Sequence, residues 1–315
     1  MKNEGKIFLF VKTILFATLI KLNIRYVMAQ RLPILLALFF SIFLMAQNQR
    51  FMYEYRFSPD SLNKGFVLKE IMNLDVTKEG SVFYSNVLLD KDSVFNEQYN
   101  KGKTQGHIVL DFSKVKKTTV NFVVSKSYPK YETALKTSFN ALHLIVKEEK
   151  QMQWNILPDT KVIEGYKVQK ATTNFAGRDW IAWFTNDIQI QDGPYKFHGL
   201  PGLILSVADE AGDHNFNIIA IKKQYARTYM EYSKKNQLYV TETKFNQLWN
   251  DYKKDPAKNI KMIHGSSEMS DTIFFNSNTG QPMTKQELIR NKEEGDKKYF
   301  KYYNNFIERN LYKQR

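Results

Sequence analysis

Apolar and polar residues alternate along most of the chain from residue 51 to about residue 222, and this period of two predicts β-strands. The first segment shows the pattern most clearly, and its aromatic face consists of Phe51, Tyr53, Tyr55 and Phe57. Further strands are predicted at 66–76, 82–89, 107–112, 118–124, 142–146, 151–156, 162–175, 180–185, 203–208 and 216–221. Short strands in chain order favour an antiparallel meander, and we expect a strongly curved open sheet or half-barrel.

The pattern changes after about residue 240, where apolar residues recur every three or four positions and predict helices. Residues 243–253 carry one such face, formed by Phe245, Leu248, Trp249 and Tyr252. Thr284 and Glu287 fit a capping box, which opens a helix that runs to about Tyr303, with or without a break near Gly295. The stretch 96–104 is interpreted as a loop. The predicted fold is α+β, mainly antiparallel β, with C-terminal helices from about residue 240 in a single domain over 47–315.

The N-terminal 46 residues contain a targeting signal. Residues 28–46 begin with a short basic part, continue with an apolar run and end at Ala46, which is the three-part pattern of a secretory signal peptide. A second apolar stretch at 7–20 leaves two alternatives: either Met28 is the true start, or the chain carries two short hydrophobic segments. The run in 28–46 is too short for a comfortable membrane span. We expect export to the periplasm or an association with the outer envelope, with no transmembrane span in the mature chain.

Composition excludes several kinds of site. The chain has 315 residues and no cysteine, which excludes disulfides, thiolate metal sites, a cysteine nucleophile and a lipoprotein anchor. Aromatic residues make up 14% of the chain, which suits half-buried sheets. The net charge of +14 is scattered over lysine-rich loops and the C-terminal helix. We interpret it as a solvated basic surface and expect no nucleic-acid partner for an exported protein.

The run 193–207, GPYKFHGLPGLILSV, is the most specific feature of the sequence and is called the signature below. It begins with three glycines and two prolines within ten residues, and its dipeptides at 193–194 and 201–202 are turn formers. Two interpretations stay open. The signature is a packing device that fixes a corner of the sheet, or its glycines let a ligand or a partner's backbone come close.

Arg178 is the most informative charged residue. It stands in a turn beside Trp180 and Trp183, where it could stack on an indole or grip a carboxylate such as Asp179 or Asp187. If the signature has a binding role, the place to look for it is where Arg178, Trp183 and His198 could converge on its glycines. The candidate binding region comprises Arg178, Trp180, Trp183, Tyr195, Phe197, His198, Gly199, Leu200, Pro201, Gly202 and Asp209.

Catalytic constellations are poorly supported. The five histidines show no HxH or HExxH spacing, so no metal site is predicted. No G-x-S-x-G elbow, Ser-x-x-Lys pair or P-loop is present. The local acid–histidine grouping combines His198 or His214 with Asp209 and Asp213. We therefore predict no catalytic residues, no cofactor and no enzyme activity, with a hydrolase that uses this grouping as the alternative.

Four stretches together resemble the GLPGLI family of exported bacterial proteins. They are AGRDWIAWF at 176–184, the signature at 193–207, Asp209 after it, and NNFIE at 304–308, where Phe306 stands in place of the usual proline. The resemblance spans roughly residues 50 to 310. It implies export in Gram-negative bacteria and an envelope setting, and it brings no catalytic residues.

These features lead to one functional expectation and two alternatives. We expect a secreted, non-enzymatic cell-envelope protein whose curved sheet binds a hydrophobic or extended ligand or an envelope partner. The alternatives are an accessory protein of an outer-membrane transport or secretion system and a periplasmic hydrolase. The sequence indicates no oligomeric state.

Overall fold

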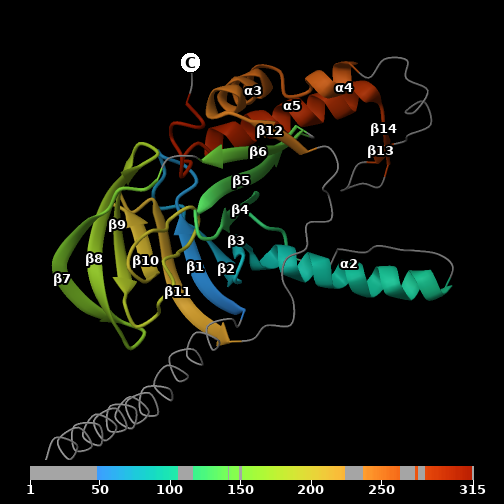
Figure 1. Ribbon diagram of the computed structural model, residues 1–315. Helices are drawn as coiled ribbons and strands as arrows, with labels where there is room; N and C mark the ends of the chain where they lie inside the picture. The colour runs from blue at the N-terminus through green and yellow to red at the C-terminus, as the bar shows by residue number, and fades with distance from the viewer. Residues whose placement is uncertain are drawn as a thin grey trace, which may run out of the picture. The chain divides into compact units, whose positions relative to one another are not determined.

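The computed structural model describes residues 48–105, 116–140, 142–148, 151–223, 237–262, 274–275 and 281–313 (Figure 1). Residues 48–315 belong to one compact unit. Its main element is a twelve-stranded sheet with the strand order β12-β6-β5-β4-β3-β2-β1-β11-β10-β9-β8-β7. The strand predicted at 107–112 lies outside the described residues.

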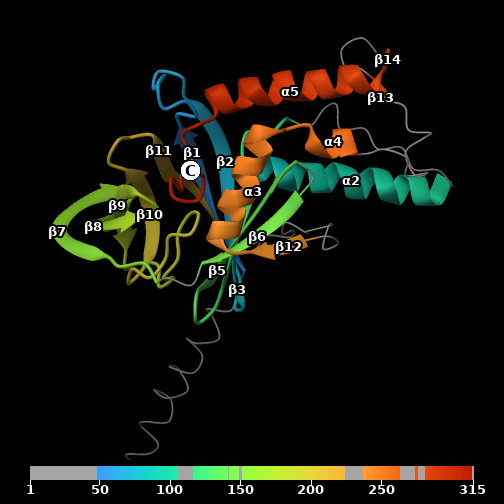
Figure 2. The same cartoon turned by 90° about the horizontal axis from the view of Figure 1, so that it is seen from above.

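The sheet consists of two antiparallel meanders, β1 to β6 and β7 to β11, which join where β1 pairs with β11. The strands are β1 Gln49–Phe57, β2 Leu68–Val76, β3 Gly80–Ser85, β4 Phe122–Ser127, β5 Glu132–Phe139, β6 Leu142–Glu148, β7 Asn155–Ile163, β8 Tyr166–Phe175, β9 Arg178–Thr185, β10 Leu203–Asp209, β11 His214–Lys223 and β12 Gln237–Val240. β12 runs parallel to β6. Figures 1 and 2 show the sheet curving from β7 to β6. The predicted α+β fold with a curved, mainly antiparallel sheet is confirmed.

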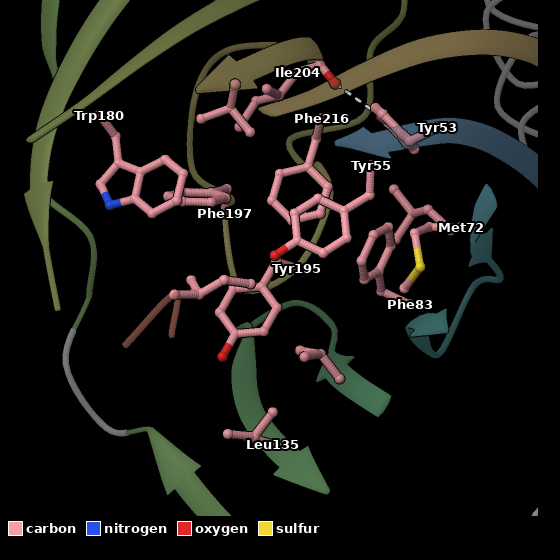
Figure 3. Packing of buried hydrophobic residues seen from close by; sticks show 14 of the residues in the cluster. Tyr53, Tyr55, Met72, Phe83, Leu135, Trp180, Tyr195, Phe197, Ile204 and Phe216 are labelled. Atoms are coloured by element: carbon pink, nitrogen blue, oxygen red, sulfur yellow. Dashed lines mark hydrogen bonds between the residues drawn. The ribbon is translucent and has the colours of Figure 1, made fainter. Parts of the chain in front are cut away.

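Aromatic side chains on the inner face of the sheet form the core. Tyr55 on β1 lies opposite Phe216 on β11, and their rings stack with centroids 4.2 Å apart. The Tyr53 hydroxyl donates a hydrogen bond of 2.8 Å to the carbonyl oxygen of Ile204, so a polar group of this core is satisfied (Figure 3). The alternation seen in the sequence therefore marks the buried face correctly.

Two predicted strands are corrected around β7. The segment predicted as one strand over 162–175 is a hairpin, because Glu164 and Gly165 have φ angles of 48° and 81° and form the turn between β7 and β8. The strand predicted at 151–156 begins only at Asn155. Residues 151–154 make no ladder and cross from β6 to β7 as a connecting strap.

The stretch 96–104 is helical, which corrects the predicted loop. α2, Asn86–Gln105, contains the pair Phe95 and Tyr99, whose rings stack 5.7 Å apart. The ion pair of Glu97 with Lys101, 2.7 Å long, also joins residues four positions apart. Within each pair the two side chains lie on the same face of the helix and stabilise it, although the polar composition of this stretch suggested a loop.

The C-terminal helices agree with the helical spacing. They are α3 Glu242–Lys254, α4 Lys258–Met262 and α5 Lys285–Tyr302, accompanied by the two-residue strands β13 Phe274–Phe275 and β14 Pro282–Met283. The capping box of Thr284 and Glu287 is present, and α5 continues through Gly295 without a break. Trp249 of α3 lies edge-on against Phe139 of β5, with ring centroids 5.2 Å apart. No helix in the described ranges is long and apolar enough to cross a membrane.

Candidate functional site

Residues 186–202 connect β9 to β10, and one buried lysine holds this loop. The Lys126 ammonium on β4 lies 2.5 Å from Asp192 Oδ1 and donates to the carbonyl oxygens of Gly193, at 2.7 Å, and Tyr195, at 2.8 Å. Burial lowers the pKa of Lys126, and the nearby Asp192 carboxylate opposes that shift. The Ser81 hydroxyl donates to the other oxygen of Asp192 at 2.6 Å. A paired, buried charge therefore fixes the first half of the signature.

Two glycines of the signature, Gly199 and Gly202, have different structural reasons for being glycine. A Cβ on Gly202 would lie 1.9 Å from the carbonyl oxygen of Thr185, closer than any side chain can approach. Gly199 has a φ of 91°, which favours glycine, and nothing lies within 4 Å of the Cβ it lacks. Leu200 is buried and Pro201 is exposed. At Gly202 this geometry favours the packing interpretation of the signature.

Arg178 clamps the C-terminal segment onto the sheet. Its side chain is buried, and its Nη1 lies 2.6 Å from Asp209 Oδ2 and 3.4 Å from Asp213 Oδ2. Nη2 donates to the side-chain oxygen of Asn305 at 2.5 Å and to the carbonyl oxygen of Phe306 at 2.8 Å. Arg178 therefore acts as a structural clamp whose partners include two carboxylates.

The two tryptophans of the candidate region lie on opposite faces of β9. Trp180 points into the core and packs against Phe197, with ring centroids 4.7 Å apart (Figure 3). Trp183 alternates with it, and the Lys161 ammonium lies 4.0 Å from the centroid of its ring. Among the described residues neither indole stacks on Arg178.

Three segments singled out in the sequence instead meet around a pocket of about 210 Å³, which we call the signature pocket. They are the end of β8 with its following turn, the signature, and the C-terminal stretch 304–308. Its lining residues are Thr133, Glu148, Gln151, Met152, Gln153, Asn174, Phe175, Ala176, Lys196, His198, Glu242, Glu308, Asn310 and Leu311.

A lysine and two glutamates form the charged centre of the signature pocket. Lys196 Nζ lies 2.7 Å from Glu308 Oε1 and 3.8 Å from Glu148 Oε2, and the side chains of Lys196 and Glu308 are only 2% and 5% exposed. The Tyr195 hydroxyl donates a short hydrogen bond to the same Glu308 oxygen. Within the described chain Glu308 Oε2 has no hydrogen-bond partner, so it is left to accept hydrogen bonds from a ligand.

His198 adds a second acceptor to the pocket wall. Its Nδ1 lies 2.8 Å from the carbonyl oxygen of Lys196, and since a carbonyl only accepts, Nδ1 carries the proton. Burial lowers the pKa of His198, so the ring is neutral near pH 7 and its Nε2 is an acceptor. The ring stacks on Tyr131, 5.1 Å between centroids, and the His198 carbonyl accepts a 2.8 Å hydrogen bond from Trp154 Nε1.

Sequence reasoning missed the charged residues of this pocket. Lys196 lies inside the signature and Glu308 inside the stretch NNFIE at 304–308, so both belong to patterns singled out in the sequence. Glu148, at the end of β6, carries no such signal. In the ranges that the structure describes, no group of three or more histidines and carboxylates is placed to hold a metal ion.

Asp209 and His214 of the predicted acid–histidine grouping make structural contacts with other groups, and their side chains do not bond to each other. Asp209 accepts a hydrogen bond from the backbone N–H of His214 at 2.8 Å, whereas the His214 ring contacts the Tyr55 hydroxyl through Nδ1 at 2.7 Å. Burial and the positive charge of Arg178 lower the pKa of His214 to about 3, Arg309 adds to this effect, and Asp213 opposes it.

The depressed pKa of His214 predicts a loss of stability on acidification. The folded state resists protonation that the unfolded chain accepts below about pH 6.5, so the free energy of unfolding falls as the pH drops from about 6.5 towards 3. Between pH 7.5 and 5 we expect wild type to lose about 2 kcal/mol more than His214→Phe. Urea unfolding at both pH values measures this, and equal losses in the two proteins would contradict it.

Comparison with known proteins gives one family and two solved structures. Residues 110–247 match the family described as "N-glycanase peptide, N-terminal domain". Structures of PNGF-II in space groups P21 and C2 are similar to this chain, each with 16% identity, a TM-score of 0.45 and 64% of this chain covered. The chain spans about a third of the length of those proteins, 33% and 32%. No curated protein matches the sequence significantly.

The match at residues 110–247 corrects the functional expectation. The expectation of a cell-envelope protein with a hydrophobic ligand or an envelope partner, or of a transport accessory, gives way to a likeness to the N-terminal domain of an N-glycanase. The matched region includes every lining residue of the signature pocket except Glu308, Asn310 and Leu311. The part of the N-glycanase that is matched is its N-terminal domain.

Proposed function

We propose that this protein recognises the carbohydrate of glycoproteins and that the signature pocket holds it. The observation that carries the proposal is Glu308, a deeply buried carboxylate whose Oε2 is left for a ligand. A carboxylate oxygen that lines a pocket and makes no bond to the protein can accept hydrogen bonds from a ligand.

The chemistry of the pocket suits sugars. Saccharide hydroxyls donate hydrogen bonds, and the pocket offers the acceptors Glu308 Oε2 and His198 Nε2 together with the side-chain amides of Gln151 and Asn310. Phe175 supplies an aromatic surface for the apolar face of a sugar ring. A site built to bond hydroxyl groups discriminates strongly against analogues that lack them.

The proposal assigns recognition, and not bond cleavage, to this domain. Lys196 and Tyr195 both engage Glu308 Oε1, which immobilises the carboxylate as an acceptor. The match to the N-terminal domain of an N-glycanase supports a glycan as the ligand. Export and membership of the GLPGLI family are part of the same proposal, supported by the pattern at 28–46 and by the signature.

Calorimetric titration with an asparagine-linked chitobiosyl glycopeptide tests the proposal. Glu308→Gln is expected to weaken binding about tenfold or more, because a charge-assisted hydrogen bond is lost. Gln151→Ala, at an exposed rim position, is expected to weaken binding without changing the melting temperature. The matched control is Glu79→Gln, whose side chain is 71% exposed in the β2–β3 turn.

Two results would count against glycan recognition. One is a wild-type protein that does not bind the glycopeptide, or that binds the unglycosylated peptide equally well. The other is unchanged affinity in both Glu308→Gln and Gln151→Ala. Since Gln151→Ala removes no buried contact, its result stands even if Glu308→Gln lowers stability.

A further inference from the structure

A second hollow, of about 570 Å³, adjoins the signature pocket and is called the β8–β9 hollow. The two share Gln153 and Asn174 in their walls. Gln151 lines only the signature pocket and Asn155 only the β8–β9 hollow, so the strap at 151–154 leads from one to the other.

The strap is fixed at the junction of the two hollows. The Thr173 hydroxyl donates a 2.6 Å hydrogen bond to the carbonyl oxygen of Gln153, and Trp154 Nε1 donates one of 2.8 Å to the carbonyl oxygen of His198. Gln153 and Asn174 line both hollows, so a ligand that contacts these two residues reaches both hollows without a change in the fold.

The wall of the β8–β9 hollow alternates polar groups with one apolar patch. Thr172 on β8 lies opposite Ile181 on β9, and the next pair on the same face of the sheet is Asn174 with Asp179, whose side chains are hydrogen-bonded at 2.8 Å. By strand alternation these four residues lie on the face of the sheet opposite the Trp180 side chain. Glu210 adds an exposed carboxylate beside them.

This arrangement fits an extended chain of sugar rings. The half-buried Ile181 offers an apolar contact for the C–H face of a ring, and the surrounding hydroxyl, amide and carboxylate groups pair with ring hydroxyls. The signature pocket alone, at about 210 Å³, is smaller than the usual range of a small-molecule site, about 300 to 1,000 Å³. A larger glycan therefore needs further surface, and the β8–β9 hollow is the surface continuous with the pocket.

We propose that the β8–β9 hollow is an extension subsite that binds the outer saccharide units of a glycan whose first units occupy the signature pocket. The proposal rests on the proposed function and deepens it, because it names the ligand as an oligosaccharide longer than the disaccharide at the asparagine. The protein then distinguishes a complete N-linked glycan from a trimmed one.

Titration with two glycopeptides tests the subsite. One carries only the chitobiosyl unit and the other a complete high-mannose glycan on the same peptide. The variant Asn155→Ala/Glu210→Gln changes two exposed residues of the hollow, and Asn100→Ala/Glu79→Gln makes the same exchanges at exposed positions elsewhere. We expect wild type to bind the complete glycan about tenfold more tightly, and the hollow variant to lose that gain while its affinity for the short glycopeptide changes less than twofold.

The outcomes separate the two proposals. If wild type binds the short glycopeptide and gains nothing from the complete glycan, or if the hollow variant keeps the full gain, the extension subsite is overturned and the signature pocket stands. If wild type binds neither glycopeptide, the proposed function fails and the subsite with it. The control variant is expected to behave as wild type with both glycopeptides.

Discussion

Replacing Lys126 with methionine is expected to lower the free energy of unfolding by about 3–5 kcal/mol. The Lys126 side chain is fully buried and forms an ion pair with Asp192, whose side chain is also fully buried. Methionine keeps the length of the side chain but leaves the Asp192 carboxylate without its counter-charge and the loop carbonyls of Gly193 and Tyr195 without their donor.

Urea unfolding compares Lys126→Met with Lys130→Met, which changes an exposed lysine three residues after the end of β4 and is expected to change stability by less than about 0.5 kcal/mol. The double variant Lys126→Met/Asp192→Asn is expected to recover part of the loss, since the uncompensated charge is removed. A loss below about 1 kcal/mol for Lys126→Met would show that the buried pair does not fix the signature loop.

The strands were predictable where one face is buried and the other is solvated. In β1 the alternation of Tyr53 and Tyr55 with polar residues reports directly which side chains face the core. The strap at 151–154 has a similar composition but pairs through Trp154 and the Gln153 carbonyl with residues distant in sequence. No local pattern contains those partners, so its lack of a ladder could not be predicted.

The stretch 96–104 was predicted as a loop and is helical, although the contacts that stabilise the helix are local in sequence. Its stabilising pairs, Phe95 with Tyr99 and Glu97 with Lys101, are spaced by four residues within a polar, lysine-rich background. The polar composition of this stretch is typical of a loop, whereas the four-residue spacing of its pairs is typical of a helix. A test for pairs four residues apart would have predicted the helix.

The candidate site was located in part. The sequence singled out Arg178 and left two contacts open, an indole or a carboxylate such as Asp179 or Asp187. The structure pairs Arg178 with the carboxylates of Asp209 and Asp213, which are more distant along the chain. Long-range pairs depend on how strands come together, here β9 with the β10–β11 turn. The same limit explains why Lys196 was not joined to a glutamate more than a hundred residues away.

The clamp at Arg178 links the stability of the fold to the proposed site. Arg178 binds Asn305 and the carbonyl oxygens of Phe306 and Ile307, which directly precede Glu308. Glu308 is therefore delivered to the signature pocket by a segment that β9 holds in place. The recognition carboxylate depends on tertiary contacts and not on the signature alone.

Gly202→Ala is expected to be the most damaging single-methyl change in the signature. The added Cβ would lie 1.9 Å from the carbonyl oxygen and 2.7 Å from the carbonyl carbon of Thr185, both backbone atoms that cannot move without shifting β9. Overpacking usually costs about 1–3 kcal/mol, and a clash with backbone lies at or above the upper end. We expect a loss of about 3 kcal/mol or more, measured by urea unfolding, or a failure to fold.

Gly199→Ala separates the clash from the conformational preference of glycine within the same motif. Gly199 has a φ of 91° and nothing within 4 Å of the added Cβ, so the expected cost is the left-handed backbone alone, about 1–2 kcal/mol. Gly295→Ala, in the interior of α5 with open space around it, is expected to stabilise the protein by about 0.5–1 kcal/mol. If Gly202→Ala were no worse than Gly199→Ala, backbone approach to Thr185 would not be the reason for glycine there. The ligand-approach interpretation of the signature would then have to be restored, because the protein's own chain would no longer explain why position 202 is glycine.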